Sequence, residues 1–411
     1  MLQRITKSAV VGMTMLALAV PATAADLDLN IYGASAQFLY WEAAAPVFLN
    51  GKGCTDIAQD RYDSKNGITR GTCGSDTVYL RYSSKASFDG ILAVKGDSSM
   101  AGSAEKCSEG DPGVPTGQAG FYRKMIDPAS CPWDGTGNTN CSALKCYRVT
   151  LGASDVAGET FTQASSGNLK GPAGGGTVTR SFNGIDTSGL DHYNPLIVPF
   201  AFFAHDSVTR DSSPIENLPR MMPVQIFAGQ AWYWSDFGGD FNTDPIVACM
   251  RHAGSGTQAT LDYAVMRGNG WGANYYTAQN SSEPTVWFND GSSDMMSCLN
   301  RTGGIGFADA DQSPPSGTHR LKYQGEEASR VNIRNGRYDF WSTQWLYENP
   351  SAPNYSTTHP WISGLMAFAE NPDNIPTAKA NWWAAKSEMV YMKTTDKTYP
   401  QYVGCTDCQT P

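Results

Sequence analysis

One segment, residues 245–265, requires a strand, a tight turn and a helix in immediate succession. It reads PIVACMRHAGSGTQATLDYAV, in which a strand-like apolar stretch ends at Arg251 and a helical pattern resumes at residue 258. The small residues between them permit a sharp turn, and the first N–H groups of a helix lack partners within it. Elsewhere, segments typical of strands alternate with segments typical of helices. The sequence therefore predicts an α/β fold.

The turn after Arg251 has the chemistry of an oxyanion site. Ser255 and Thr257 can donate hydroxyl hydrogen bonds, Gly256 leaves the backbone N–H accessible, and Arg251 supplies a forked cation. His252, inside the turn, is a further candidate contact, because a protonated imidazole adds positive charge. The alternative is an ordinary helix-capping turn beside a surface arginine.

Enzyme and metal sites are not expected. A nucleophile elbow, G-x-S-x-G, is ruled out because Ala253 stands at its first glycine, and no set of nucleophile, base and acid is evident. No catalytic residue, no cofactor and no metal are predicted. Asp309 and Asp311 lack the glycine and terminal glutamate of a calcium loop. Four histidines are expected to be structural or on the surface: His192, His205, His319 and His359.

The first 24 residues predict a secretory signal peptide. Arg4 and Lys7 precede an apolar run at residues 9–19, and small residues lead to a cleavage site after Ala24. A retained membrane anchor is the alternative, although the run is short for a membrane span. No cysteine follows the cleavage site, as a lipid anchor would require. We expect a protein that is exported, periplasmic or otherwise, and soluble after cleavage.

Ten cysteines and the charge balance agree with export. The even number favours disulfides, and proximity in the sequence favours five pairs. These pairs are Cys54–Cys73, Cys107–Cys131, Cys141–Cys146, Cys249–Cys298 and Cys405–Cys408. Residues 97–146, rich in Gly, Ser, Pro and Asp, are interpreted as a disulfide-stapled surface insertion with little core. The net charge of −9 and the absence of a basic run argue against nucleic-acid binding.

Three further turns join strands to following segments in the same way. They contain Gly33-Ala34-Ser35-Ala36-Gln37-Phe38, Arg81-Tyr82-Ser83-Ser84-Lys85-Ala86-Ser87 and Gly152-Ala153-Ser154-Asp155, with Ser35 as the expected helix N-cap. Strands are expected at residues 26–33, 77–82, 147–151, 196–203, 245–250, 303–307 and 341–347. Helices are expected at residues 37–48 and 258–265 and in part of 218–234, and a glycine-rich loop at residues 171–176.

In their order these motifs resemble the phosphate-binding periplasmic proteins of ABC transporters, which have the type II solute-binding fold. GASAQFLYWEAAAPVF, YSSKAS, VTLGASD and RHAGSGT resemble the family's four ligand-facing turns. The segment NPLIVPFAFF resembles the strand that crosses into the second lobe. The segment MMPVQIFAGQAWYWSDF resembles a helix that ends in a Trp-Asp turn, and GGIGFAD resembles a late strand. The resemblance covers residues 27–91 and 147–348, apart from the glycine-rich loop.

The resemblance implies a two-lobed α/β protein with ligand between the lobes. One lobe would contain residues 26–195 and 312–411, and the other residues 196–311. The implied ligand contacts are Gln37, Phe38, Ser83, Ser84, Asp155, Arg251, His252, Ser255, Gly256 and Thr257. The implied ligand is inorganic phosphate or a related oxyanion, captured by a monomer for an ABC transporter permease.

Two positions depart from the family pattern. The anion loop usually has an Asp that accepts the proton of hydrogen phosphate where Ala253 stands, and the first turn usually has Thr where Gln37 stands. Loss of an acceptor changes which oxyanion is preferred. These departures and the insertion also suit an alternative, in which the binding fold serves as a structural or cell-surface interaction protein. Six tryptophans are expected in the core or on the lobe surfaces, with a sugar-stacking cleft as the alternative: Trp232, Trp234, Trp341, Trp345, Trp382 and Trp383.

Overall fold

The computed structural model describes residues 26–134, 139–161, 164–168, 177–181, 184–252, 254–267 and 286–404. The predicted signal peptide, the glycine-rich loop and the predicted Cys405–Cys408 bond lie outside these residues. Within the described ranges, no helix combines the length and the apolar character needed to cross a membrane.

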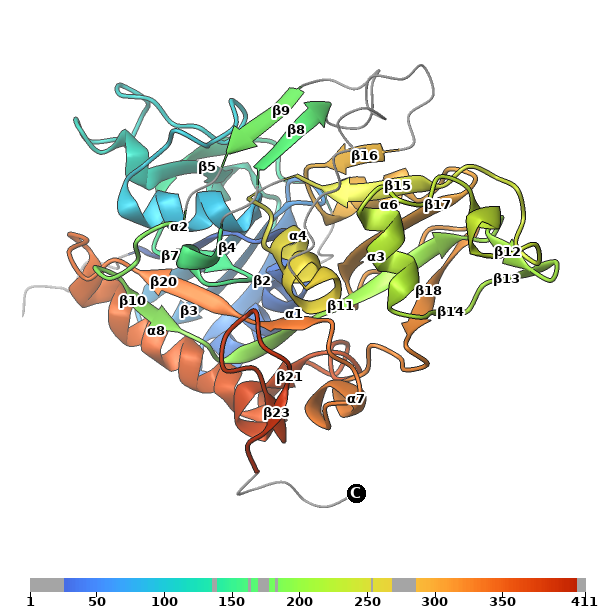
Figure 1. Cartoon of the computed structure of the whole chain (residues 1–411). Helices are drawn as coiled ribbons and strands as arrows, with labels where there is room; N and C mark the ends of the chain where they lie inside the picture. The colour runs from blue at the N-terminus through green and yellow to red at the C-terminus, as the bar shows by residue number, and fades with distance from the viewer. Residues whose placement is uncertain are drawn as a thin grey trace, which may run out of the picture.

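The first of two large sheets is built around the N-terminal strand. Its seven strands have the order β10-β20-β7-β1-β4-β3-β2, and β1 pairs in parallel with both β4 and β7 (Figure 1). Its strands are β1 (Asp26–Gly33), β2 (Thr55–Arg61), β3 (Asn66–Cys73), β4 (Asp76–Ser84), β7 (Leu151–Ser154), β10 (Asp191–Tyr193) and β20 (Trp345–Glu348).

Leu29 and Ile31 lie in the core cluster that contains helices α1 (Phe38–Gly51) and α8 (Tyr355–Glu370). Tyr32, on the other face, packs in a cluster with helix α2 (Ser87–Lys95). The alternation predicted for β1 thus positions helices on both faces of the sheet.

The second sheet is organised by the long apolar strand β11. Residues Phe200–His205 pair with β17 and β18, and Leu196–Pro199 pair with β19 and β21. Its eight strands are β11 (Leu196–His205), β14 (Asn217–Leu218), β15 (Val247–Arg251), β16 (Val286–Asn289), β17 (Gly304–Asp309), β18 (Thr318–Tyr323), β19 (Trp341–Thr343) and β21 (Ala384–Ala385). Trp234, Trp341 and Trp383 are fully buried, which confirms their expected place in the core. Trp232 is 37% exposed, so among the expected positions it has one on the lobe surface.

The remaining helices follow the predicted pattern in part. They are α3 (Met221–Phe227), α4 (Gly256–Thr260), α6 (Ser292–Cys298) and α7 (Arg330–Arg334), and α4 continues directly into a π-helical turn, η6 (Leu261–Met266). Helix α1 is preceded by a 3-10 turn, η1 (Ser35–Gln37), so Ser35 lies inside a helical turn and does not cap α1. The N-cap prediction for Ser35 was wrong because its buried hydroxyl faces Ser292, 3.4 Å away, across the molecule.

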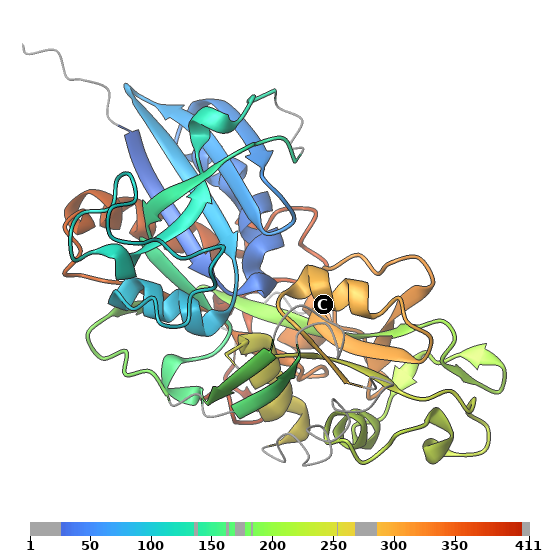
Figure 2. The same ribbon diagram turned by 90° about the horizontal axis from the view of Figure 1, so that it is seen from above.

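The chain passes from β10 to β11 and from β19 to β20 at two adjacent points, and it reaches the second sheet again at β21. The molecule is a two-lobed α/β structure. β10 leads into β11 through Asn194, and β19 leads into β20 through Gln344. Asn194 Nδ2 donates to the carbonyl of Gln344 at 2.7 Å, and the Gln344 N–H donates to the carbonyl of Leu196 at 2.9 Å. Figure 2 shows the blue and cyan N-terminal segments gathered on one side and the yellow and orange segments on the other.

The strand pairing differs from the expected division into lobes at β18, β19 and β21, which all pair with β11. Residues 318–323 were expected in the first lobe, but β18 pairs with β11, and the chain returns to the first sheet only at β20. The strand predicted over residues 341–347 is accordingly two strands, β19 and β20, in different sheets. A one-dimensional pattern did not place the break, because only strand pairing with β11 or with β7 separates the two segments.

The cysteine-rich insertion contains disulfides that differ from two of the predicted pairs. Cys107 is bonded to Cys146 and Cys131 to Cys141, so the predictions Cys107–Cys131 and Cys141–Cys146 were wrong. The Cys131–Cys141 bond therefore lies within the loop that the Cys107–Cys146 bond closes. This arrangement follows from the hairpin of β5 (Tyr122–Ile126) and β6 (Leu144–Arg148), which folds the second half of the insertion back antiparallel to the first. The pairs Cys54–Cys73 and Cys249–Cys298 are confirmed.

Three two-stranded ribbons complete the fold. They are β8 (Ala164–Asn168) with β9 (Thr177–Ser181), β12 (Thr209–Arg210) with β13 (Ser213–Pro214), and β22 (Tyr391–Met392) with β23 (Gln401–Tyr402). In the insertion, Ile126, Cys131 and Cys141 form a small buried cluster with Ile68 of β3. The insertion is therefore anchored to the first sheet by a minor core.

Candidate functional site

The segment after β15 has the predicted strand, turn and helix. β15 ends at Arg251, and Ser255 caps α4 by accepting a hydrogen bond from the N–H of Gln258 at 3.3 Å. Ala253 lies outside the described residues. The local pattern dictates this geometry because a hydroxyl before a helical run satisfies an otherwise unpaired N–H group.

Arg251 is a buried cation with an unsatisfied donor. Its side chain is 1% exposed, with Nε donating to the carbonyl of Asn289 at 3.1 Å and Nη2 to the carbonyl of Asp290 at 2.9 Å. Nη1 has no hydrogen-bond partner among the described residues. Burial lowers the pKa of Arg251, and the nearby Asp290 and Asp155 oppose that effect. A buried donor without an acceptor costs free energy, which an anion beside Nη1 would offset.

Asp155, which follows β7 in the first lobe, is the acceptor at the centre of the cluster. Gln37 Nε2 donates to its Oδ1 at 3.1 Å, Thr257 Oγ1 donates to its Oδ2 at 3.2 Å, and Ser87 Oγ lies 3.5 Å from Oδ2. Burial raises the pKa of Asp155 to about 6, although these donors and Arg251 favour the charged form. The carboxyl group is thus able to hold or accept a proton near neutral pH.

The two lobes touch directly at Gly256. Its N–H, on the second lobe, donates to Ser87 Oγ of the first at 3.1 Å, and the N–H of Phe88 donates to the carbonyl of Gly254 at 3.0 Å. A Cβ atom at position 256 would lie 2.4 Å from Ser87 Oγ and 2.7 Å from Asp155 Cβ. Only glycine permits this approach.

A second contact between the lobes is ionic. Lys85 Nζ, from the first lobe, lies 2.6 Å from Asp290 Oδ2 of the second, and Lys65 Nζ lies 3.9 Å from the same oxygen. His252 Nε2 is 3.5 Å from Asp290 Oδ1, so this predicted ligand contact faces a carboxylate. Burial opposes the charge on Asp290, yet Lys85 and His252 hold its pKa below the usual value.

Three other predicted residues lie beside the cluster, not in it. Ser83 Oγ donates to Asn66, and the Ser84 N–H donates to the carbonyl of Lys65 at 2.8 Å. Phe38 packs against Tyr82, with ring centroids 5.9 Å apart. Phe38 and Ser84 also help to line a pocket of about 200 Å³ between the lobes, which the following residues complete: Ser35, Leu39, Arg61, Ser64, Lys65, Gly291, Ser292, Ser293 and Gln312.

Two residues of the cluster were not among the predicted contacts. Ser87 stands at the end of the YSSKAS motif, so the motif contained the signal. Gln344 gave none, because it reaches the site only through the second crossing between the lobes. Its Nε2 donates to Gln37 Oε1 at 2.9 Å, which orients the Gln37 amide toward Asp155.

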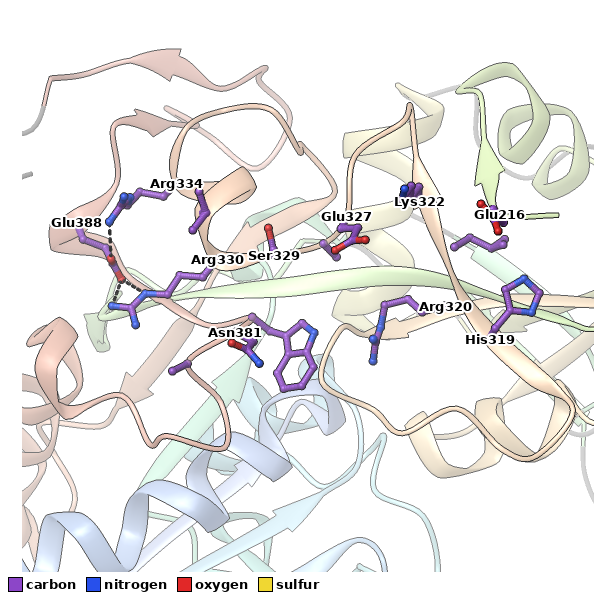
Figure 3. A pocket seen from close by; sticks show the side chains of 15 residues that line it. Glu216, His319, Arg320, Lys322, Glu327, Ser329, Arg330, Arg334, Asn381 and Glu388 are labelled. Atoms are coloured by element: carbon purple, nitrogen blue, oxygen red, sulfur yellow. Dashed lines mark hydrogen bonds and ion pairs between the residues drawn. The ribbon is translucent and has the colours of Figure 1, made fainter. Parts of the chain in front are cut away.

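A larger pocket lies elsewhere, with a volume of about 990 Å³ (Figure 3). It is lined by β18, α7 and residues 380–382, and by none of the predicted contacts. Arg330 and Arg334 at its edge face the carboxylate of Glu388. Like Arg251 Nη1, the Nε atoms of Arg320 and Arg334 in this pocket have no hydrogen-bond partner among the described residues. Arg251 differs in being 1% exposed and in lying near Asp155, where the two lobes meet.

A comparison with solved structures finds proteins to which this chain is similar at low sequence identity. The chain is similar in fold to solved phosphate-binding proteins. One is a putative phosphate ABC transporter substrate-binding protein from Clostridium perfringens, with a TM-score of 0.48 and 16% identity over 85% of this chain and 97% of that one. Another is a phosphate-binding protein from Stenotrophomonas maltophilia, with a TM-score of 0.46 and 12% identity over 86% and 89% of the two chains. A DING protein is similar at a TM-score of 0.44 and 14% identity, over 85% and 90%. No protein-family model matches the sequence. The two-lobed α/β assignment itself rests on the sheets and crossings described above.

The pKa of Asp155 predicts a pH dependence of stability. An acid whose pKa rises from 3.8 to about 6 on folding binds its proton more tightly in the folded state. Its contribution to the free energy of unfolding therefore falls by up to about 3 kcal/mol as the pH rises from 4 to above 6. The variant Asp155→Asn should lose this contribution, so its Tm should fall less between pH 5 and pH 8 than that of the wild type.

Thermal unfolding at both pH values checks this expectation without added anion. Asp396, whose pKa burial also raises to about 6, contributes in the same range in both proteins and cancels in the comparison. Asp211→Asn, at an exposed carboxylate, is the matched control and should follow the wild type. Identical pH profiles for Asp155→Asn and wild type would contradict the assigned burial of this carboxyl group.

Proposed function

We propose that this protein is an exported solute-binding protein that captures a small oxyanion, foremost phosphate, between its two lobes. The observation that carries the proposal is the buried Arg251 guanidinium, whose Nη1 has no acceptor among the described residues. It lies where donors and an acceptor from both lobes meet. A compact anion would supply the missing acceptor and neutralise the buried cation.

The donors around Asp155 are those that a tetrahedral oxyanion needs. The Gly256 N–H and the Thr257 and Ser87 hydroxyls now bond with one another or with Asp155. Arg251 donates to the carbonyls of Asn289 and Asp290 and keeps Nη1 without a partner among the described residues. We infer that bound anion replaces these contacts between the lobes. The anion would accept from these donors and also from Arg251 Nη1, which has no acceptor among the described residues, so the exchange adds a charge-assisted hydrogen bond.

Asp155 gives the proposal its chemical specificity. A carboxylate cannot donate while it is ionised, so it repels a fully deprotonated anion such as sulfate and accepts the proton of hydrogen phosphate. Since Ala253 supplies no carboxylate, we infer that Asp155 alone performs this discrimination. The ratio of phosphate affinity to sulfate affinity should then be smaller than in a site that has two carboxylates.

The proposal extends to the cellular setting. The predicted signal peptide would export the chain, and a monomer would deliver its anion to the membrane permease of an ABC-type uptake system. Movement at the two crossings, near Asn194 and Gln344, would open and close the lobes. Their mutual hydrogen bonds keep the crossings together while the lobes move.

The test is a titration of refolded, ligand-stripped mature protein with phosphate, arsenate and sulfate from pH 5 to pH 9. Intrinsic tryptophan fluorescence and calorimetry report binding. We expect saturable binding of phosphate and arsenate and weaker binding of sulfate. Preference for sulfate would retain the solute-binding role and change the substrate. No response to any of the three anions would overturn the proposal and favour the structural or interaction role.

A further inference from the structure

A second cluster of polar side chains lies at the far edge of the first sheet. Asp191 of β10 and Glu348 of β20 stand directly opposite each other in an antiparallel pair, and His359 of α8 lies 2.9 Å from Glu348 through its Nδ1. Figure 1 labels β10, β20 and α8. One potential ligand atom from each of the three residues lies within 4.8 Å of the others. Three elements far apart in the sequence thus place two carboxylates and one imidazole around one point.

The arrangement is electrostatically costly as the side chains stand. Like charges directly opposite in an antiparallel pair destabilise a sheet. Glu348 is only 2% exposed, and its Oε1 has no hydrogen-bond partner among the described residues. Its Oε2 accepts from the Tyr193 hydroxyl at 2.9 Å, and the Tyr355 hydroxyl donates to Asp191 Oδ2 at 2.8 Å. Both carboxylates therefore retain accepting capacity, and a buried Oε1 needs a cation or a donor.

The histidine is oriented as a metal ligand would be. His359 Nδ1 lies 2.9 Å from Glu348 Oε2, on the side of the carboxylates, and Nε2 lies 3.3 Å from Ser363 Oγ. Without metal, Nδ1–H donates to Glu348 Oε2. A metal ion would replace this proton, and Nδ1 would then offer its lone pair while Nε2–H donates to Ser363. A hydrogen bond from the second ring nitrogen fixes the tautomer and orientation of metal-bound histidines in this way.

We propose that Asp191, Glu348 and His359 Nδ1 bind one divalent transition-metal ion, Zn²⁺ or Mn²⁺, that joins the edge of the first sheet to α8. Two carboxylate oxygens and one imidazole nitrogen are ligands that both ions accept. The His359 side chain is 36% exposed, which leaves the ion a path from solvent and a position for water. Metal would stabilise the folded state by binding it in preference to the unfolded chain.

The rival account is a histidine–carboxylate ion pair with no metal, and the chain offers a matched control for it. His319 Nδ1 lies 2.7 Å from Asp206 Oδ1, with a similarly exposed imidazole, and no third ligand is grouped with this pair among the described residues. The variant His319→Ala removes an equivalent ion pair from the other lobe. Asp191→Asn and His359→Ala remove proposed ligands, and Asp191 is exposed enough for the variant to fold.

The experiment uses untagged mature protein, stripped with chelator and dialysed against trace-metal-free buffer with phosphate absent. Calorimetric titration with Zn²⁺ and with Mn²⁺, elemental analysis after dialysis and Tm with and without metal are the readouts. Circular dichroism establishes that each variant is folded. Wild type and His319→Ala should bind one equivalent and gain Tm. Asp191→Asn and His359→Ala should bind at least about 100-fold more weakly, since even residues that only support a ligand contribute 10–100-fold.

The proposal is overturned if wild-type protein binds neither ion, or if folded Asp191→Asn and His359→Ala bind as tightly as His319→Ala does. It is also overturned if His319→Ala alone loses metal. None of these outcomes depends on whether the cleft between the lobes binds phosphate.

Discussion

Arg251→Ala is expected to abolish phosphate binding. The guanidinium is fully buried, is positioned by the carbonyls of Asn289 and Asp290, and has one free N–H donor. Its removal deletes the charge that offsets the cost of burying the anion. Truncating one partner of a buried charged pair costs about 2–5 kcal/mol, which corresponds to a loss of about thirtyfold to several thousandfold in affinity. Arg251→Lys should recover little of this, because an ammonium cannot form the same fork.

Calorimetric titration with phosphate at pH 7 measures this effect. Arg301→Ala is the matched control, because Arg301 belongs to the same lobe and its guanidinium stacks on Trp287 at 3.5 Å, outside the cluster. We expect near-native affinity for this control. Near-native affinity in folded Arg251→Ala would instead show that the anion site lies elsewhere.

Gly256→Ala should have an effect of comparable size through sterics alone. The added Cβ would meet Ser87 Oγ at 2.4 Å and the backbone N of Asp155 at 3.0 Å, so the lobes could not approach as they do here. Overpacking of a close contact costs about 1–3 kcal/mol. Because the clash exists only when the lobes meet, the cost falls on the closed state. We expect about tenfold to a hundredfold weaker phosphate binding with little change in the stability of either lobe.

Small-angle X-ray scattering with and without saturating phosphate, together with calorimetry, checks this prediction. The variant should keep a larger radius of gyration than wild type when anion is present. Gly239→Ala is the control, because a Cβ there meets nothing within 4 Å. A variant Gly256→Ala that closes and binds like wild type would show that the contact between Gly256 and Ser87 is not part of binding.

The local elements could be predicted because their signals lie within short stretches. The apolar alternation of β1, the run of β11 and the strand, turn and helix around Arg251 all follow from residues within one or two turns of each other. Burial periodicity and helix capping act over these distances. The same reasoning located Asp155, Thr257 and Gly256, which the structure brings together.

Errors arose where a residue's role is set by a distant partner. Ser35 was expected to cap a helix, but its hydroxyl faces Ser292. The cysteines of the insertion were paired by proximity, whereas a hairpin nests them as Cys107–Cys146 and Cys131–Cys141. In each case the sequence offered a reasonable local partner, and tertiary packing provided another.

The sequence by itself determined the α/β class, the main strands and the donor-rich turn after Arg251, because hydrophobic period and turn chemistry are properties of neighbouring residues. Only the tertiary structure decided that Gln344 orients Gln37, that β18 joins the second sheet, and that Asp191 and Glu348 oppose each other beneath His359. These relations join residues from 11 to 307 positions apart. Burial and hydrogen-bond satisfaction select such contacts for the whole fold at once, and no short sequence pattern encodes them.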